Sequence, residues 1–159
     1  MAGHPPAGDG PVASSGGVRS PAPDDASPDA PVPGRVAVVG PCASGKSVLV
    51  ARLEAAGYDA WQPAQEHSYV PDMWRRLTRP EVLIYLDVSL PELLARRRTN
   101  FTQAYLEEQR RRLRHAREHC DLYLPTDDLS EEGVFSRVVS VLDSRGIAPR
   151  PASPERHGP

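Results

Sequence analysis

The chain has 159 residues, with 19 Lys and Arg against 21 Asp and Glu and a formal net charge of -2. This length suits one domain with a single core, and its 2 cysteines form neither a disulfide framework nor a zinc site. No apolar run approaches the roughly 20 residues of a membrane span, and no signal-peptide pattern opens the chain. We therefore expect a cytoplasmic protein in a reducing compartment, without membrane attachment.

The two ends of the chain differ from its middle. Residues 1–34 are mostly Pro, Gly, Ala and Ser, with almost no large apolar side chain. Such a segment buries too little surface to offset its conformational entropy, so it predicts a disordered tail, with a partner-docking arm as the alternative. Residues 147–159 have the same character. The predicted domain is therefore 35–146.

The segment GPCASGKS at residues 40–47 fits the phosphate-loop pattern G-x-x-x-x-G-K-[ST]. An apolar strand at 36–39 precedes it, and a helical pattern follows, with Leu49, Leu53 and Ala56 on one face and an end at Gly57. In this pattern the lysine reaches the phosphates and the last serine binds Mg²⁺. The expected nucleotide contacts are Gly40, Pro41, Cys42, Ala43, Ser44, Gly45, Lys46, Ser47 and Val48.

Lys46 is also the only lysine, since the other 18 of the 19 basic residues are arginines. An ammonium suits a crowded phosphate better than a planar guanidinium does, so this exception favours phosphate binding. The alternative is a strand-to-helix turn in which GKS occurs by chance, but the flanking strand and helix make that interpretation the weaker one.

The next segment predicts a short strand at 58–63, followed by Gln65, Glu66 and His67. Because ligands in open α/β sheets bind at the carboxyl ends of the strands, these polar side chains would face the phosphate loop. A polar surface loop without a ligand is the alternative. A short helix around residues 73–77 then ends before Pro80.

The clearest buried strand is 82–86, and it ends at Asp87. A hydrophobic run ending in Asp matches the loose pattern of a magnesium-site carboxylate, so Asp87 and Ser47 are the predicted metal residues. A turn or capping residue is the alternative for Asp87. Ser89 and Glu92 then form a capping box, which predicts a helix running to Arg98.

The last third of the chain predicts an Arg-rich helix at 102–119, a short strand at 122–124 and a final helix capped by Ser130. In the Arg-rich helix, a solvated basic face at Arg110, Arg114 and Arg117 is favoured over a phosphate clamp. The expected buried stripes are Leu106, Leu113 and Ala116 in that helix, and Val134, Val138, Val141 and Leu142 in the final one. Together the elements predict an α/β fold of three layers, with a small, mostly parallel sheet of about four strands flanked by helices.

The order of the phosphate loop, LIYLDVSLPELLARRR, an Arg-rich helix and DLYLPTDDLSEEGV resembles the small nucleoside and nucleotide kinase-like branch of the P-loop NTPases. The resemblance implies that Arg97, and next Arg98, are lid arginines that close over the phosphates. It also implies that the loop at 125–128, including Thr126, packs on the adenine, and that Glu66 is the general base. Against the pattern, the strand that commonly carries the metal-binding acid has no counterpart, and Asn100 and Phe101 occupy the region of a further lid arginine.

The expected function is therefore transfer of the γ-phosphoryl group of ATP or GTP, with Mg²⁺, to an unknown small-molecule acceptor. Lys46, Glu66, Arg97 and Arg98 are the predicted catalytic residues, and Glu66 competes with Asp87 for the carboxylate position at the metal. The alternative is a degenerate, non-catalytic nucleotide-binding regulatory protein. Nucleic acid is not an expected partner, because the basic belt at 75–117 lacks interleaved aromatic residues.

Overall fold

The computed structural model describes residues 29–151, so most of the predicted N-terminal tail and residues 152–159 lie outside it. The elements named below belong to one unit that begins at Pro31. Their order is β1 (Val32–Val39), α1 (Lys46–Ala55), β2 (Asp59–Trp61), the 3-10 turn η2 (Gln65–His67), α2 (Met73–Thr78), β3 (Pro80–Asp87), α3 (Leu90–Arg96), α4 (Gln103–Arg112), α5 (Arg114–His119), β4 (Leu122–Pro125) and α6 (Glu131–Ser144).

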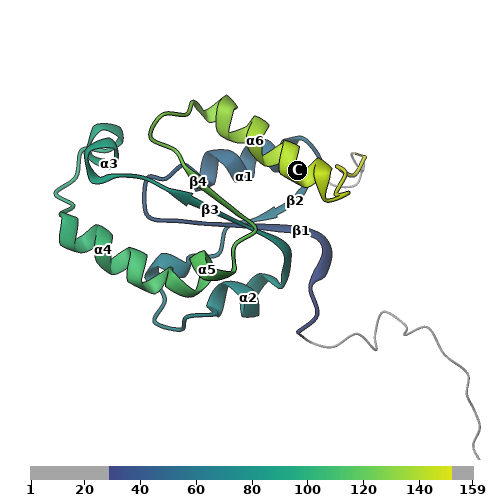
Figure 1. Ribbon diagram of the computed structural model, residues 1–159, viewed down its shortest axis with the longest axis horizontal. Helices are drawn as coiled ribbons and strands as arrows, with labels where there is room; N and C mark the ends of the chain where they lie inside the picture. The colour runs from purple at the N-terminus through teal and green to yellow at the C-terminus, as the bar shows by residue number, and fades with distance from the viewer. Residues whose placement is uncertain (1–28, 152–159) are drawn as a thin grey trace, which may run out of the picture. The chain divides into compact units, whose positions relative to one another are not determined.

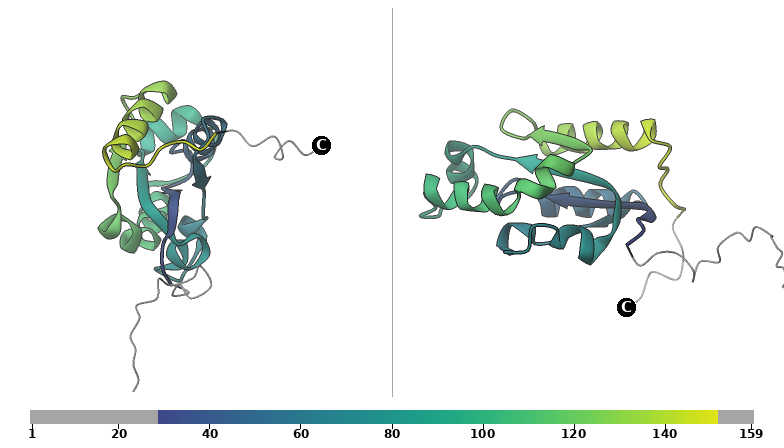
Figure 2. Two further views of the ribbon diagram at one scale, coloured as in Figure 1. Left: turned by 90° about the vertical axis from the view of Figure 1, so that its right-hand side faces the viewer. Right: turned by 60° about the horizontal axis from the view of Figure 1, so that its bottom comes forward.

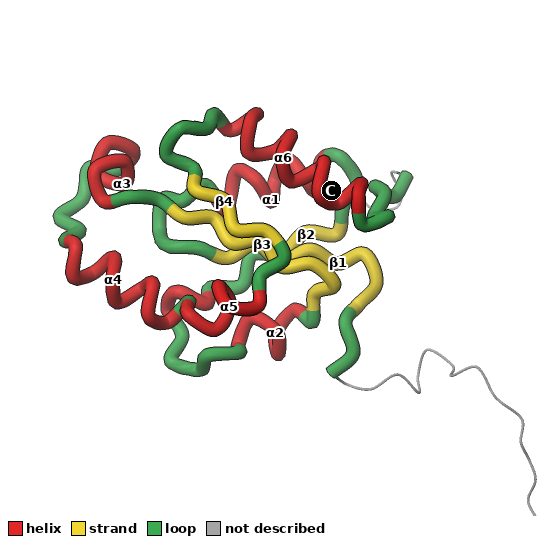
Figure 3. The backbone as a smooth tube through the Cα atoms, viewed as in Figure 1, coloured by secondary structure: helices red, strands yellow, loops and turns green. Residues whose placement is uncertain are grey.

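The four strands form an all-parallel sheet in the order β2-β1-β3-β4. Figures 1 and 3 show this sheet between two groups of helices. β1 and β3 are central, with Val36 opposite Val82 and Val39 opposite Tyr85. Because all strands run the same way, their carboxyl ends meet at one edge of the sheet, where the loops after β1, β2 and β3 gather. The predicted α/β class with about four strands is confirmed.

Helices cover both faces of this sheet, with α1 and α6 on one side and α2 and α5 on the other (Figures 1 and 2). Alternate residues of β1 therefore enter different clusters: Val38 packs with α1 and α6, whereas Val39 packs with Trp74 and Leu113. Burial on both faces explains why β1 and β3 are continuously apolar instead of alternating. Each fully buried Val, Leu or Ile here contributes about 1.5–3 kcal/mol.

Side-chain caps set the start of three helices. Ser89, Thr102 and Ser130 accept hydrogen bonds from the backbone N–H three residues ahead, at the beginnings of α3, α4 and α6. The predicted caps at Ser89 and Ser130 are thus confirmed. Gly57, with φ of 100°, takes the left-handed conformation that ends α1, and a Cβ there would lie 2.4 Å from the carbonyl oxygen of Arg150.

Several helix predictions need correction. The single helix expected at 102–119 is two helices, because Leu113 has ψ of 0° and interrupts the α-helical backbone between α4 and α5. The helix expected to reach Arg98 ends at Arg96. Ala56, expected on the buried face of α1, is exposed, and Val141 of α6 is only half-buried. Leu106, Leu113 and Ala116 are fully buried as expected.

The ordered part of the chain extends past both predicted domain limits. The Val32 backbone N–H donates to the carbonyl of Arg79, and Ile147 packs in the core with α1 and α6. No helix within residues 29–151 combines the length and apolar character that crossing a membrane requires.

Candidate functional site

The loop Gly40–Ser47 connects β1 to α1 at the carboxyl edge of the sheet. A Cβ on Gly40 would lie 2.1 Å from the carbonyl oxygen of Leu86, so only glycine allows the loop to pass this close to β3. Gly45 caps α1 with φ of 99°, in the left-handed region. The two glycines of the pattern are therefore required by the backbone.

The first turn of α1 carries no side-chain cap in the described structure, unlike α3, α4 and α6. It also contains no acidic residue. The first four N–H groups of a helix have no intrahelical acceptor, and they form the positive end of the helix dipole. The turn that begins at Lys46 therefore offers its N–H groups to an anion at the loop.

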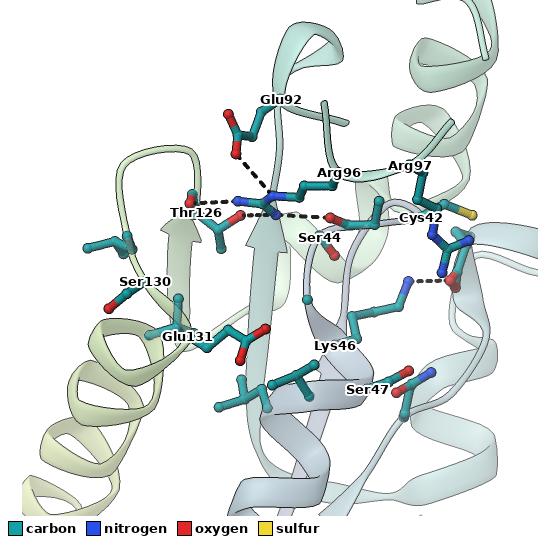
Figure 4. A pocket seen from close by; sticks show the side chains of 18 of the residues that line it. Cys42, Ser44, Lys46, Ser47, Glu92, Arg96, Arg97, Thr126, Ser130 and Glu131 are labelled. Carbon is teal, nitrogen blue, oxygen red and sulfur yellow. Dashed lines mark hydrogen bonds and ion pairs between the residues drawn. The ribbon is translucent and has the colours of Figure 1, made fainter. Parts of the chain in front are cut away.

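Lys46 is buried, with 7% of its surface exposed. Its ammonium donates to the carbonyl oxygens of Gly40 and Pro41 and forms an ion pair with Glu66. Figure 4 shows the Lys46 side chain among the residues that line the cavity. The positive charge of Lys46 thus lies beside the loop 40–47, whose residues the motif predicts to bind phosphate.

Glu66 reaches Lys46 from η2, the turn that follows β2. Only 4% of its surface is exposed, and its Oε1 atom has no hydrogen-bond partner within the described residues. An unpaired buried carboxylate oxygen is costly, so this atom indicates a missing donor within the described part of the protein.

The neighbours of Glu66 separate into two roles. His67 lines the same cavity, whereas Gln65 is buried, is not among the lining residues and bonds to neighbouring elements. The Gln65 amide donates to the carbonyls of Val70 and Arg112 and accepts from the N–H of Trp74. The sequence prediction that Gln65 faces the site is wrong, because these three bonds fix it against α2 and α4.

The cavity has a volume of about 630 Å³, within the range of small-molecule sites. One end is polar, around Lys46, Glu66 and His67; the other is formed by Thr126, Leu129 and Val134 at the start of α6. Most of the loop residues predicted to contact the nucleotide line this cavity, including Cys42, Ser47 and Val48. Gly40 and Pro41 are not among the lining residues, and their carbonyl oxygens accept hydrogen bonds from Lys46.

Arg96 is the arginine that joins the two ends of the cavity, and sequence reasoning passed over it in favour of its neighbours. Its guanidinium donates to the Ala43 carbonyl at 2.9 Å, to the Thr126 hydroxyl at 3.1 Å and to the Thr126 carbonyl at 2.9 Å (Figure 4). The sequence contained a pattern that could have indicated Arg96. This residue lies seven residues after the cap Ser89 and four after Glu92, on the same helical face.

Arg97 and Arg98, which follow Arg96 in the chain, differ in their position relative to the cavity. Arg97 lines the cavity (Figure 4), while Arg98 is exposed and is not among the described residues that do so. Of the three consecutive arginines, Arg96 and Arg97 line the described cavity, so of the two predicted lid arginines only Arg97 lies at the site.

Asp87 lies apart from the cavity, contrary to the metal role predicted for it. Its carboxylate is 6% exposed and accepts from Arg110 at 3.1 Å, from the Tyr123 hydroxyl and from its neighbour's N–H, that of Val88, at 2.9 Å. Burial, and then this hydrogen bond to Asp87, raise the pKa of Tyr123. In this structure the Asp87 carboxylate is engaged by these three donors and does not line the cavity with Ser47, and its metal role stays a prediction.

The same contact corrects the prediction for Arg110. This arginine does not belong to a solvated face, because its guanidinium also donates to the Val88 carbonyl at 2.9 Å. Arg114 is exposed, as expected, and pairs with Glu118 one turn ahead. Within residues 29–151, no group of three or more His, Cys, Asp or Glu side chains could enclose a metal ion by itself.

Neither protein-family models nor curated proteins match this sequence. A function for this chain is therefore inferred from the geometry of the cavity and its lining residues.

Proposed function

We propose that this chain is a P-loop NTPase-like protein that binds the triphosphate of ATP or GTP at residues 40–47 and transfers its γ-phosphoryl group to a small-molecule acceptor. The observation that carries the proposal is the buried Lys46 ammonium, held beside a glycine loop whose following helix turn is uncapped. Together, these groups provide a cation and several backbone donors for one anion.

The residues present fit a triphosphate with magnesium. The Ser44 hydroxyl, like Glu66 Oε1, is a buried polar atom without a partner in the described chain, which supports a polar ligand at this place. The Ser47 hydroxyl would hold Mg²⁺. When bound, the ion would supply positive charge that neutralises the charge of the phosphates.

The opposite end of the cavity suits a nucleobase. Leu129 and Val134 supply apolar surface there, and Thr126 borders it. The Arg96 guanidinium is fixed by hydrogen bonds along its edges, which leaves the face of a planar cation for stacking on an aromatic ring.

Glu66 is the proposed general base at the polar end. A carboxylate with one unpartnered oxygen can accept the proton of an acceptor hydroxyl, while Lys46 and Arg97 stabilise charge on the transferred group. A phosphate would compete with Glu66 for the Lys46 ammonium, so binding would release the carboxylate for this role.

A specific observation favours a second candidate, a nucleotide-binding protein without turnover. Asp87 is bound by Arg110 and Tyr123 and is not among the residues that line the described cavity, so the carboxylate predicted beside Ser47 is engaged elsewhere. Nucleotide binding would survive this gap more readily than catalysis, which needs precise charge placement.

A thermal-shift experiment tests nucleotide binding. Saturating Mg-ATP or Mg-GTP should stabilise the protein, by about 2.7 kcal/mol when the ligand is at a hundred times its Kd. Lys46→Ala should lose most of this shift, measured against its own ligand-free melting temperature. The matched control Arg52→Ala changes an exposed basic residue in the same helix and should retain it.

No shift of the wild-type chain with any nucleoside triphosphate at millimolar concentration would reject both candidates. A shift without phosphorylated product, from a panel of small alcohols analysed by mass spectrometry, would favour the binding protein over the kinase.

A further inference from the structure

A second reactive group lies in the phosphate loop itself. Cys42 is the third residue of the loop, is only partly buried and lines the cavity (Figure 4). Neither the phosphate contacts nor the proposed transfer uses its sulfur atom. Its surroundings differ from those of the other thiol, Cys120, and indicate a role in exchange chemistry.

The Gln109 side chain of α4 hydrogen-bonds both the backbone and the sulfur of Cys42. The Cys42 backbone N–H donates to Gln109 Oε1 at 2.9 Å, and because that N–H can only donate, it determines which end of the amide faces it. The amide nitrogen then donates to Cys42 Sγ at 3.1 Å. Gln109 is 2% exposed, so this donor is fixed beside the sulfur.

His67 provides a base on the other side of the thiol. Its Nε2 atom lies 3.9 Å from Cys42 Sγ, within reach of the thiol proton. Arg97 lines the same cavity and adds positive charge, whereas the nearby negative charge of Glu66 is paired with Lys46. A donor, a base and a cation around a partly exposed thiol are the conditions that make cysteines reactive.

The cavity also contains groups that would hold a thiol compound. Glu66 Oε1 is nine-tenths buried, lacks a partner in the described chain and could accept from an ammonium or amide N–H. Arg97 could pair with a carboxylate. These two groups fit the polar parts of an amino-acid thiol or a short thiol peptide.

We propose that Cys42 undergoes thiol–disulfide exchange with a low-molecular-weight disulfide of the amino-acid type, and that the mixed disulfide blocks the phosphate loop. Cys42 transfers its proton to His67, and the thiolate attacks one sulfur of the disulfide. A Cys42 Sγ–S bond forms, the reagent S–S bond breaks, and the departing thiolate takes the proton from His67. Cys42 is oxidised and one reagent sulfur is reduced.

The expected result of this exchange is loss of nucleotide binding, and this consequence alone rests on the proposed function. An adduct on Sγ would lie in the cavity beside Lys46, where the phosphates are proposed to bind. A reducing agent would restore the free loop, so the modification acts as a reversible switch.

Cys120 serves as the internal control. Its thiol donates to the carbonyl of Arg117 at 3.1 Å, and burial, followed by the charge of Asp121, raises its pKa. It has no base or donor directed at its sulfur among the described contacts. Cys120 should therefore exchange slowly in the folded protein.

The test treats the full reduced chain with excess cystine or glutathione disulfide, and maps the modified peptides by mass spectrometry over time. Cys42 should react at least about tenfold faster than Cys120, because a donor, a base and a cation surround its sulfur, whereas none is directed at the Cys120 sulfur among the described contacts. Cys42→Ser should remove the fast phase, whereas Cys120→Ser should retain it. His67→Asn should slow the fast phase several-fold without a change in melting temperature.

Equal rates at the two cysteines, or a fast phase that maps to Cys120, would overturn the proposal; wild-type peptide mapping gives this answer even where a variant folds poorly. Nucleotide shifts are then compared before and after modification. Loss of the shift on modification, with recovery in reductant, supports the blocking step, and an unchanged shift refutes it. Absence of any shift in the reduced chain would reject the nucleotide proposal, while the exchange rates would still decide the reactivity of Cys42.

Discussion

At the scale of single residues, Lys46 and Glu66 form a buried ion pair whose desolvation opposes folding. Both side chains are more than nine-tenths buried, so each charge depends on the other and on the loop carbonyls for solvation. A buried ion pair contributes little net stability, but removing one partner leaves an uncompensated charge. The pair therefore adds little to stability, and the proposed anion site would give its burial a function.

The first prediction is a double-mutant cycle on this pair. Lys46→Ala should lower the free energy of unfolding by about 3 kcal/mol, because it leaves the Glu66 carboxylate buried and unpaired. Adding Glu66→Gln should recover at least about 1 kcal/mol of that loss, measured by urea denaturation.

The control cycle is Arg114→Ala with Glu118→Gln, an ion pair whose side chains are 79% and 59% exposed. Its coupling should stay below about 0.5 kcal/mol. Additive losses at Lys46 and Glu66 would show that the two charges do not depend on each other.

The second prediction concerns Asp87. Asp87→Asn weakens the ion pair to Arg110 and the hydrogen bond from Tyr123, so the free energy of unfolding should fall by about 2 kcal/mol. The magnesium dependence of nucleotide affinity should remain that of the wild type, because the carboxylate does not border the cavity. Asp143→Asn, an exposed change in α6, serves as the stability control. A large change in the magnesium midpoint would instead return Asp87 to the metal site.

At the scale of elements, α4 connects the candidate site to the sheet. Gln109 reaches the phosphate loop and Arg110 reaches the end of β3, from adjacent positions on the helix. A second tie joins α3 to the connection between β4 and α6, where the Ser89 N–H donates to Asp127. Hydrogen bonding from the Ser89 side chain, and then from its N–H, lowers the pKa of Asp127. The second tie holds α3, which contributes Glu92 and Arg96 to the cavity lining, beside the connection that contributes Thr126.

The helices α2 and α5 meet through a histidine whose protonation is coupled to their packing. The Trp74 indole donates to His115 Nδ1 at 3.1 Å, so this nitrogen must be unprotonated in the folded chain. Burial, then the charges of His119 and Arg75, lower the pKa of His115. The folded state therefore binds a proton at His115 less readily than the unfolded state does.

The third prediction follows from this difference. Stability contributed by neutral His115 should be present at about pH 7.5 and should be lost as the pH falls through the ordinary imidazole pKa of about 6.5. The urea midpoint of the wild type should drop more between about pH 7.5 and 5.5 than that of His115→Gln. His119→Gln removes one of the charges and should raise the pKa of His115, as followed by NMR. Equal midpoint losses in wild type and His115→Gln would contradict the coupling.

At the scale of the whole molecule, the core draws in residues from beyond the predicted domain limits. Ile147 is 7% exposed and packs with α1 and α6, and the Arg150 N–H donates to the carbonyl of Gly57 at 2.8 Å. The segment after α6 thus closes over the end of α1, although its composition resembles that of the tail.

The fourth prediction tests this closure. Ile147→Ala should lower the free energy of unfolding by about 2 kcal/mol, through lost burial and the cavity left behind. Leu77→Ala makes a similar truncation at a residue that is 63% exposed, and should stay within about 0.5 kcal/mol of the wild type. Similar small losses for both variants, in urea or thermal denaturation, would show that Ile147 is not part of the core.

The sequence by itself determined the features that depend on residues close to one another in the chain. Strands β1 and β3 follow from continuous apolar runs, the caps at Ser89 and Ser130 from local side-chain bonds, and the loop from its two required glycines. These features involve residues within a few positions of one another, so a pattern in the chain is sufficient to indicate them.

Only the tertiary structure decided which charged groups meet. Glu66 joins Lys46 across 20 residues, and Arg110 joins Asp87 across 23. At the sequence level each of these acids and arginines had several partners of equal chemical suitability, and helix packing selected among them. The break at Leu113 and the burial of Ile147 have the same origin, because burial against distant elements outweighs the weak local preference of a single residue.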